Sequence, residues 1–275
     1  MRSLTPILLL FAAASTATGA TKEIAWHYNF DEGVALSKAL ARPMLLDFWA
    51  TWCGPCRRMD TEVWANEKVN SFADRYVFIK VDMDRERDVG DRYAVHAIPT
   101  MMVADPWGHA AQKREGFANS FEVAGLLGLL PWDYREVSNE FNALEQDSKN
   151  GKALQSIGLF YAKWRAFNLS SEYYHNALKS SLAKEDEAMR EDLTLGIALN
   201  DFRDGKTGAA RKKLVLFLKT FPNGRRQPEA MLAEVAVALR ERKRSDAEKI
   251  FQELQQRFPD SQATHNAAGM LAQAK

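Results

Sequence analysis

Cysteine is scarce in this sequence. Among 275 residues there are two, Cys53 and Cys56, and only Gly54 and Pro55 separate them. A disulfide between such close neighbours closes a ring too small to constrain much of the unfolded chain, so the pair is not expected to staple the fold. Its presence calls for a chemical explanation.

Histidine is scarce as well. The five histidines stand singly along the chain, without the spacing of metal ligands. A zinc site needs four ligands, and the two cysteines supply half of them at most. A reversible dithiol is therefore favoured over a zinc site or an inert disulfide, and no cofactor or metal is expected.

The chain also lacks a net charge. Its 37 basic and 36 acidic residues give a formal charge of +1, which provides no global field to attract nucleic acid or an anionic surface. Basic clusters such as Arg240 to Arg244 are interpreted as solvated helix faces, because no base-stacking aromatic pattern is interleaved with them. No nucleic-acid partner is expected.

Long apolar runs are missing beyond the N-terminus. Residues 1–20 have the pattern of a secretory signal peptide, with Arg2, an apolar run centred on Leu8 to Phe11 and small residues through Ala20. A membrane anchor is the alternative, but this run is shorter than the roughly 20 residues that span a bilayer. The end of the chain, "LAQAK", carries no endoplasmic-reticulum retention signal. We therefore expect export to the bacterial periplasm, with no membrane anchor after the signal is removed.

Alternating helical and buried-strand patterns surround the two cysteines. A helix is expected over Asp31 to Ala41, and strands over Met44 to Trp49, Tyr76 to Asp84 and Met101 to Ala104. The cysteines fall where the first of these strands ends and a helix begins. Because the N–H groups and dipole of a helix N-terminus stabilise a thiolate, Cys53 is placed for nucleophilic chemistry.

An ordered set of motifs over Trp26 to Leu130 resembles the thioredoxin family, and within it the C-terminal domain of the exported transmembrane disulfide reductase. The motifs are Asp47-Phe48, Trp52-Cys53-Gly54-Pro55-Cys56, Lys80-Val81-Asp82, Tyr93 through Thr100, and Gly116. This resemblance implies an α/β thioredoxin fold for residues 21–131.

The resemblance also implies roles for the residues around the dithiol. Cys53 corresponds to the exposed nucleophile and Cys56 to the buried resolving cysteine. Asp47 corresponds to the buried carboxylate that exchanges a proton with Cys56, and Lys80 lies close to it. On the residues alone, a structural core carboxylate remains the alternative for Asp47, and a surface lysine the alternative for Lys80.

Substrate-binding residues are implied in the same way. Pro99 corresponds to the cis-proline that faces the disulfide, and Ile98 to the residue whose main chain pairs with an extended substrate. Trp52, Gly54 and Pro55 form the rim of the site. An ordinary trans proline in a loop remains the alternative for Pro99.

Strand patterns vanish after Pro131, and helical periodicity continues over residues 132–275. "AARKKLVLFLKTFPN" from Ala209 and "DAEKIFQELQQRFPD" from Asp246 repeat with a period of about 37 residues. Together with an earlier unit, Leu154 to Ala177, they resemble three degenerate tetratricopeptide hairpins. A helical bundle without repeats is the alternative, and either arrangement carries no acid, base or metal constellation.

Two functions follow from this organisation. The first is an exported thiol-disulfide oxidoreductase that reduces protein disulfides, because the family's reducing members carry Gly-Pro between the cysteines. Its partners would be disulfide-containing proteins, an upstream dithiol donor and a protein held by the helical repeats. The second is a tetratricopeptide scaffold or assembly adaptor whose thioredoxin-like domain is a redox-gated docking unit.

Overall fold

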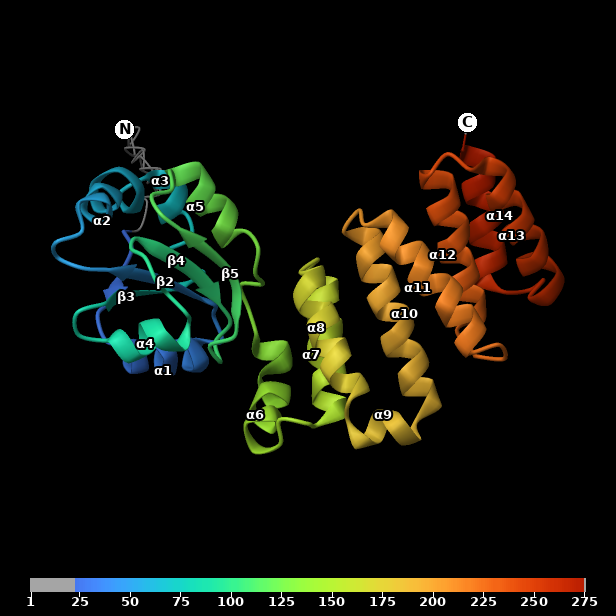
Figure 1. Ribbon diagram of the computed structural model, residues 1–275, viewed down its shortest axis with the longest axis horizontal. Coiled ribbons are helices and arrows are strands. Elements are labelled where there is room, and N and C mark those ends of the chain that lie inside the picture. Colours follow the sequence, from blue (N-terminus) through green and yellow to red (C-terminus); the bar gives the residue numbers. More distant parts are fainter. Residues whose placement is uncertain (1–22, 275) are drawn as a thin grey trace, which may run out of the picture.

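A computed structural model describes residues 23–274, and the expected signal peptide lies outside them. The molecule is elongated (Figure 1). A mixed α/β part forms one end, and a row of helices extends from it to the C-terminus.

Five strands form one sheet in the order β1-β3-β2-β4-β5. The strands β1, β3 and β2 are parallel, and β4 and β5 continue the sheet in antiparallel fashion. The strands are β1 (Trp26–His27), β2 (Met44–Trp49), β3 (Val77–Asp82), β4 (Thr100–Ala104) and β5 (Ala110–Glu115).

Helices cover both faces of the sheet (Figure 1). Apolar residues of α1 and α4 pack on one face, and those of α2, η1, α3 and α5 pack on the other. These elements are α1 (Phe30–Leu40), α2 (Gly54–Met59), the π-helix η1 (Asp60–Trp64), α3 (Glu67–Asn70), α4 (Arg87–Arg92) and α5 (Ser120–Leu127).

The strand before the cysteines was predicted correctly. Met44–Trp49 is β2, and its side chains alternate between the two apolar layers, with Leu45 in one and Leu46 in the other. A strand buried on both faces needs a nearly continuous apolar run, which is what the sequence shows. The strand Ala110–Glu115 was not predicted, because its edge position leaves it largely exposed and rich in polar residues.

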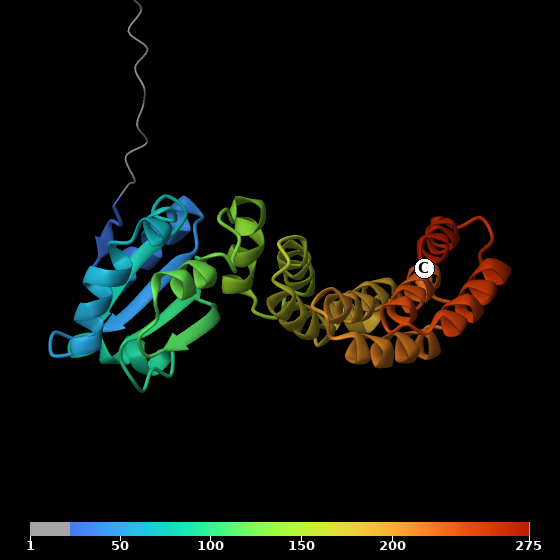
Figure 2. The same ribbon diagram turned by 90° about the horizontal axis from the view of Figure 1, so that it is seen from above.

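Nine helices follow in the described part of the chain. They are α6 (Ser138–Gln146), α7 (Gly151–Lys163), α8 (Phe167–Leu178), α9 (Ser181–Glu185), α10 (Glu187–Arg203), α11 (Thr207–Thr220), α12 (Gln227–Arg240), α13 (Arg244–Arg257) and α14 (Gln262–Gln273), after a short 3₁₀ turn η2 (Arg135–Val137). They form a curved row of hairpins (Figure 2). Within residues 23–274 no helix combines the length and the apolar character that a membrane span requires.

The repeat seen in the sequence falls on equivalent helices of this row. Ala210 lies in α11 and Ala247 in α13, and both are fully buried. Each of these helices is the second of a hairpin, α10–α11 and α12–α13. The small residue at this place lets the paired helices approach closely.

One apolar core runs from the sheet into the helices. The cluster that contains Leu45 and Met101 of the sheet continues through Tyr134 and Phe141 to Tyr161 of α7. Tyr134 is fully buried, and its backbone N–H donates to the carbonyl of Ala41 at 2.8 Å. A boundary drawn at residue 131 therefore cuts through a continuous hydrophobic core.

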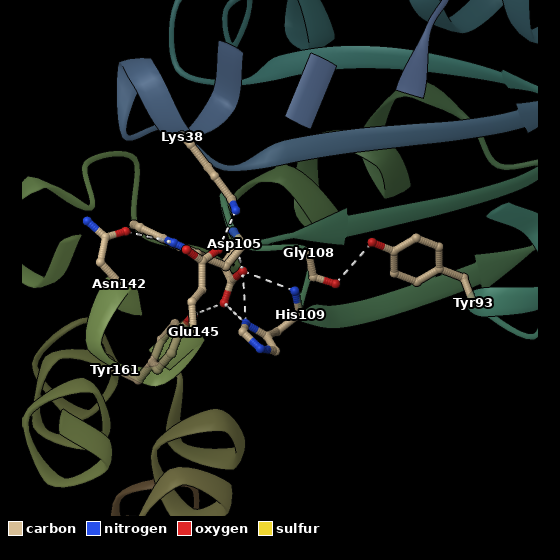
Figure 3. A network of polar contacts seen from close by, with 9 residues as sticks. Lys38, Tyr93, Asp105, Gly108, His109, Asn142, Glu145 and Tyr161 are labelled. Carbon is tan, nitrogen blue, oxygen red and sulfur yellow. Dashed lines mark hydrogen bonds and ion pairs between the residues drawn. The ribbon is translucent and has the colours of Figure 1, made fainter. Parts of the chain in front are cut away.

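The sheet and the helices are also joined by a buried carboxylate. Asp105, which follows β4, accepts hydrogen bonds from the backbone N–H groups of Trp107 and His109 at 2.9 and 3.0 Å. It also contacts Nδ1 of His109 at 3.0 Å and accepts from the hydroxyl of Tyr161 on α7 at 3.0 Å (Figure 3). Nearby, Trp107 stacks on Phe141 of α6 with ring centroids 4.2 Å apart. The β4–β5 turn thus anchors the helical part.

This anchor lies at the end of the sheet remote from the cysteines. In the β2–β4 pairing Phe48 is opposite Thr100, and Met44 is opposite Ala104. Asp105 therefore follows the end of β4 that lies beside the start of β2, whereas the cysteines follow the end of β2. The row of helices therefore begins at one end of the sheet, the junction pole, and the cysteines lie at the opposite end, the dithiol pole.

Candidate active site

The two cysteines open helix α2. Cys53 is the N-cap residue, and its Sγ accepts from the backbone N–H of Cys56 at 3.2 Å. Pro55 is in the first turn, where its missing N–H leaves no intrahelical bond unmade. The two cysteines form a disulfide with an S–S distance of 1.96 Å. The helix N-terminus thus supports a thiolate at Cys53 once the disulfide is reduced.

Exposure does not distinguish the two cysteines in this oxidised state. Each residue is 3% exposed, so Cys53 is not the exposed partner that its resemblance-based role implies. The bond to Cys56 covers part of the Cys53 sulfur, and only its position at the helix start sets it apart. The rim around the pair is open, because Trp52 is 66% exposed and Gly54 and Pro55 are exposed.

Asp47 is buried in the middle of the sheet. It is 2% exposed, and its Oδ2 lies 3.1 Å from Nζ of Lys80, its neighbour in the β2–β3 pairing. Its Oδ1 has no well-formed hydrogen bond among residues 23–274, and the indole of Trp64 lowers the pKa of Asp47 only weakly. Burial, opposed only in part by the charge of Lys80, raises the pKa of Asp47 to about 6. This carboxyl group can therefore gain or lose a proton near neutral pH.

Lys80 is not a surface lysine, because its side chain is 6% exposed. Its ammonium group lies 4.9 Å from the ring centroids of both Trp26 and Trp49. Burial lowers the pKa of Lys80, but the carboxylates of Asp47 and Asp60 outweigh this and raise it overall. Lys80 thus keeps its charge beside Asp47.

Asp60 was missed in the sequence. Its Oδ1 lies 2.5 Å from Nζ of Lys80, so the lysine bridges a buried and a half-exposed carboxylate. Asp60 follows Cys56 by four residues, which is about one helical turn. The four-residue spacing was the only signal for Asp60 in the sequence. It identifies Asp60 as part of the site only once the position of Lys80 on β3 is known.

The loop before β4 shares a cleft with Trp52, the residue that precedes Cys53. The Ile98–Pro99 peptide bond is cis, and the carbonyl of Pro99 accepts from the backbone N–H of Gly116 at 2.8 Å. Ile98 and Trp52 line one cleft of about 460 Å³. Trp52 is oriented there by a hydrogen bond from its Nε1 to the carboxylate of Asp84 at 3.1 Å.

The sequence model of the thioredoxin family matches residues 23–124. Thioredoxin of Echinococcus granulosus is 40% identical over 108 residues, which are 38% of this chain and 86% of that protein. The chain belongs to the thioredoxin family. Thioredoxin of Griffithsia pacifica is 35% identical over 103 residues, covering 38% of this chain and 78% of that protein.

A solved structure is also similar, the oxidized form of mitochondrial thioredoxin 3 from Saccharomyces cerevisiae. It is 26% identical and covers 38% of this chain and 92% of its own, with a TM-score of 0.29. The thioredoxin family model ends at residue 124, before the helices α6 to α14. Membership implies thiol-disulfide oxidoreductase chemistry for the dithiol and leaves the role of those helices open.

Proposed function

We propose that this chain is an exported protein-disulfide reductase whose helical part holds partner proteins. The observation that carries the proposal is the position of the Cys53–Cys56 pair at the start of α2, next to a strand that holds Asp47 with a raised pKa. Thiol exchange needs a stabilised thiolate, a second thiol in reach and a proton acceptor. The thioredoxin unit offers all three.

In the proposed reaction, the thiolate of Cys53 attacks one sulfur of a substrate disulfide. The substrate S–S bond breaks, one substrate thiolate leaves, and a mixed disulfide forms on Cys53. Asp47 then accepts the proton of Cys56, and the resulting thiolate attacks the Cys53 sulfur. The second substrate sulfur leaves as a thiolate and takes up a proton, and the protein is oxidised to its Cys53–Cys56 disulfide. An upstream dithiol donor would reduce this bond again.

The substrate side is supported by the cleft that Trp52 and Ile98 line and by the exposure of Gly54 and Pro55. The docking role is supported by the place of the helical row. It starts at the pole of the sheet opposite to the dithiol, so a protein held there leaves the redox face accessible. Docking would raise the local concentration of chosen substrates without altering the chemistry. Export and a periplasmic location rest on the sequence of residues 1–20, outside the described residues.

The test uses the full chain and two single-cysteine variants. We expect Cys53→Ala to abolish the acceleration of insulin reduction by dithiothreitol, and Cys56→Ala to accumulate mixed disulfides on Cys53 because resolution is blocked. Trapped proteins are then identified after diagonal electrophoresis of periplasmic extracts. If Cys56→Ala traps nothing and the wild-type protein reduces insulin no faster than the Cys53→Ala/Cys56→Ala variant, the reductase proposal fails and a scaffold role becomes the better account.

A further inference from the structure

The helical row contains a groove that the redox chemistry does not use. It has a volume of about 450 Å³ and lies between α7 and α10, with Arg226 before α12 also in its lining. Its other lining residues include Lys152 and Leu159 of α7, and Arg203 of α10. The groove lies on the row of helices that starts at the pole of the sheet remote from the dithiol.

The floor of the groove is fixed by one aromatic ring. Tyr174 of α8 lies between Gly158 of α7 and Gly196 of α10. A Cβ atom at Gly158 would come within 2.5 Å of the ring, and one at Gly196 within 2.6 Å. Asn200 of α10 donates from Nδ2 to the hydroxyl of Ser170 on α8 at 2.8 Å. These contacts hold α7 and α10 at a set separation, so the groove is preformed.

The groove carries more positive than negative charge. Lys152 and Arg203 are both exposed, and neither forms an ion pair within residues 23–274. The carboxylate in the lining, Asp192, is already engaged by the guanidinium groups of Arg225 and Arg226. Two cations therefore face the groove without a counter-charge, which favours an anionic occupant.

The two cations lie at opposite ends of the groove. Gly158 and Gly196 meet the same ring, and both helices run antiparallel to α8, so α7 and α10 are parallel to each other. Lys152 precedes Gly158 by six residues, and Arg203 follows Gly196 by seven. At about 1.5 Å per helical residue the two cations are about 20 Å apart along the groove. Leu159, 63% exposed, lies between them.

We propose that this groove binds an acidic, extended segment of a partner protein. An extended chain rises about 3.3 Å per residue, so about six residues span the distance between the two cations. One carboxylate of the segment pairs with Lys152 and another with Arg203, and an apolar side chain between them covers Leu159. This inference rests on the docking role proposed for the helical row and names the chemistry of the docked segment.

The test measures binding of a fluorescent peptide to the full-length protein by anisotropy. The peptide carries two glutamates six positions apart and a leucine two positions after the first glutamate, because alternate residues of an extended chain face the same side. The Lys152→Glu/Arg203→Glu variant should weaken binding by about tenfold or more, because two ion pairs become two repulsions. The control variant Lys212→Glu/Lys219→Glu makes the same change in net charge on exposed lysines of α11, and should bind nearly as the wild type does.

Several outcomes would overturn the proposal. The wild type could fail to bind the peptide, both double variants could lose affinity equally, or a peptide with adjacent glutamates or a DNA oligonucleotide could compete as well as the spaced peptide. Equal losses in both double variants, or competition by the peptide with adjacent glutamates or by DNA, would identify a general attraction to anions. Insulin reduction by the same variants should equal that of the wild type, so failure of the groove is distinguishable from failure of the redox proposal. If the groove variant still traps the same partners through Cys56→Ala, docking lies elsewhere on the row.

Discussion

Two buried carboxylates mark the two poles of the thioredoxin sheet, and their surroundings differ. Asp105, fully buried at the junction pole, accepts from two backbone N–H groups and from Tyr161, and it contacts the imidazole of His109. Asp47, near the dithiol pole, has Lys80 on one oxygen and no well-formed hydrogen bond among the described residues on the other. One carboxylate is satisfied, and the other is left in need of a proton or a donor.

The different surroundings of the two carboxylates indicate different roles for the two ends of the sheet. A buried carboxylate with several donors holds neighbouring segments together, because removing it leaves each donor without a partner. A buried carboxylate with incomplete partners lowers stability and has a raised pKa, a combination typical of sites that move protons. The sheet therefore has a structural pole and a chemical pole, and four substitutions can test this distinction.

Asp105→Ala should have the largest effect on stability. It leaves the N–H groups of Trp107 and His109 and the hydroxyl of Tyr161 without their acceptor, at a cost of about 3 to 5 kcal/mol. The apolar core is continuous across the junction, so the sheet and the first helices should melt together in calorimetry. Asp88→Ala, an exposed carboxylate of α4, serves as the control. A variant as stable as this control would remove the structural role of Asp105.

Asp47→Ala should change stability in the opposite direction. The folded-state pKa of about 6 lies above the usual 3.8, so the folded protein binds more protons than the unfolded chain does, and wild-type stability falls as the pH rises between these values. The Asp47→Ala variant has no carboxyl group at this position, so its stability does not fall in this pH range for this reason. Its gain over the wild type should grow from pH 4 and reach at most about 3 kcal/mol above pH 6.

The same substitution should slow chemistry while it stabilises the fold. Without Asp47 the thiol of Cys56 has no proton acceptor, so release of the mixed disulfide should slow more than its formation. Denaturant titrations between pH 4 and pH 8 and stopped-flow exchange with a peptide disulfide measure the two effects. The proton-transfer role of Asp47 would be contradicted if the stabilities of variant and wild type changed in parallel with pH. It would also be contradicted if the mixed disulfide were resolved at an unchanged rate.

Tyr161→Phe should cost less than the loss of Asp105. It removes one donor to the carboxylate, and the other donors remain, so we expect a loss of about 1.5 kcal/mol. Tyr173→Phe is the matched control, because this neighbouring ring stacks on Tyr161 and, of the two hydroxyls, only that of Tyr161 donates to Asp105 within residues 23–274. Equal losses in the two variants, measured by thermal unfolding, would show that the hydrogen bond from Tyr161 to Asp105 adds no stability.

Asp60→Asn should have the smallest effect. Its side chain is 38% exposed, so solvent screens its ion pair with Lys80, and stability should change by less than about 1 kcal/mol. The negative charge of Asp60 contributes to the raised pKa of Asp47, so the pKa of Asp47 should fall slightly. Carboxyl ¹³C titration by NMR measures this shift, with Glu62→Gln as control. A rise in the pKa would contradict the arrangement.

The dithiol pole was largely predictable from the sequence. Cys53 and Cys56 are three residues apart on one local element, and the apolar run Met44–Trp49 placed them at a strand end. Local geometry and hydrophobic pattern carry such information, because both act over a few residues. The bridging position of Lys80 was not readable, since its partners Asp47 and Asp60 meet it only through the pairing of β3 with β2.

The sequence by itself determined the chemistry and the type of each half: a Cys-x-x-Cys pair at a strand-to-helix turn, followed by a helical repeat. Tertiary structure alone decided how the halves are joined and where their charges meet. Asp105 and Tyr161 are 56 residues apart in the chain, and Lys152 and Arg203 belong to different hairpins. No local pattern reports such pairs, because their contact depends on the packing of whole elements against one another.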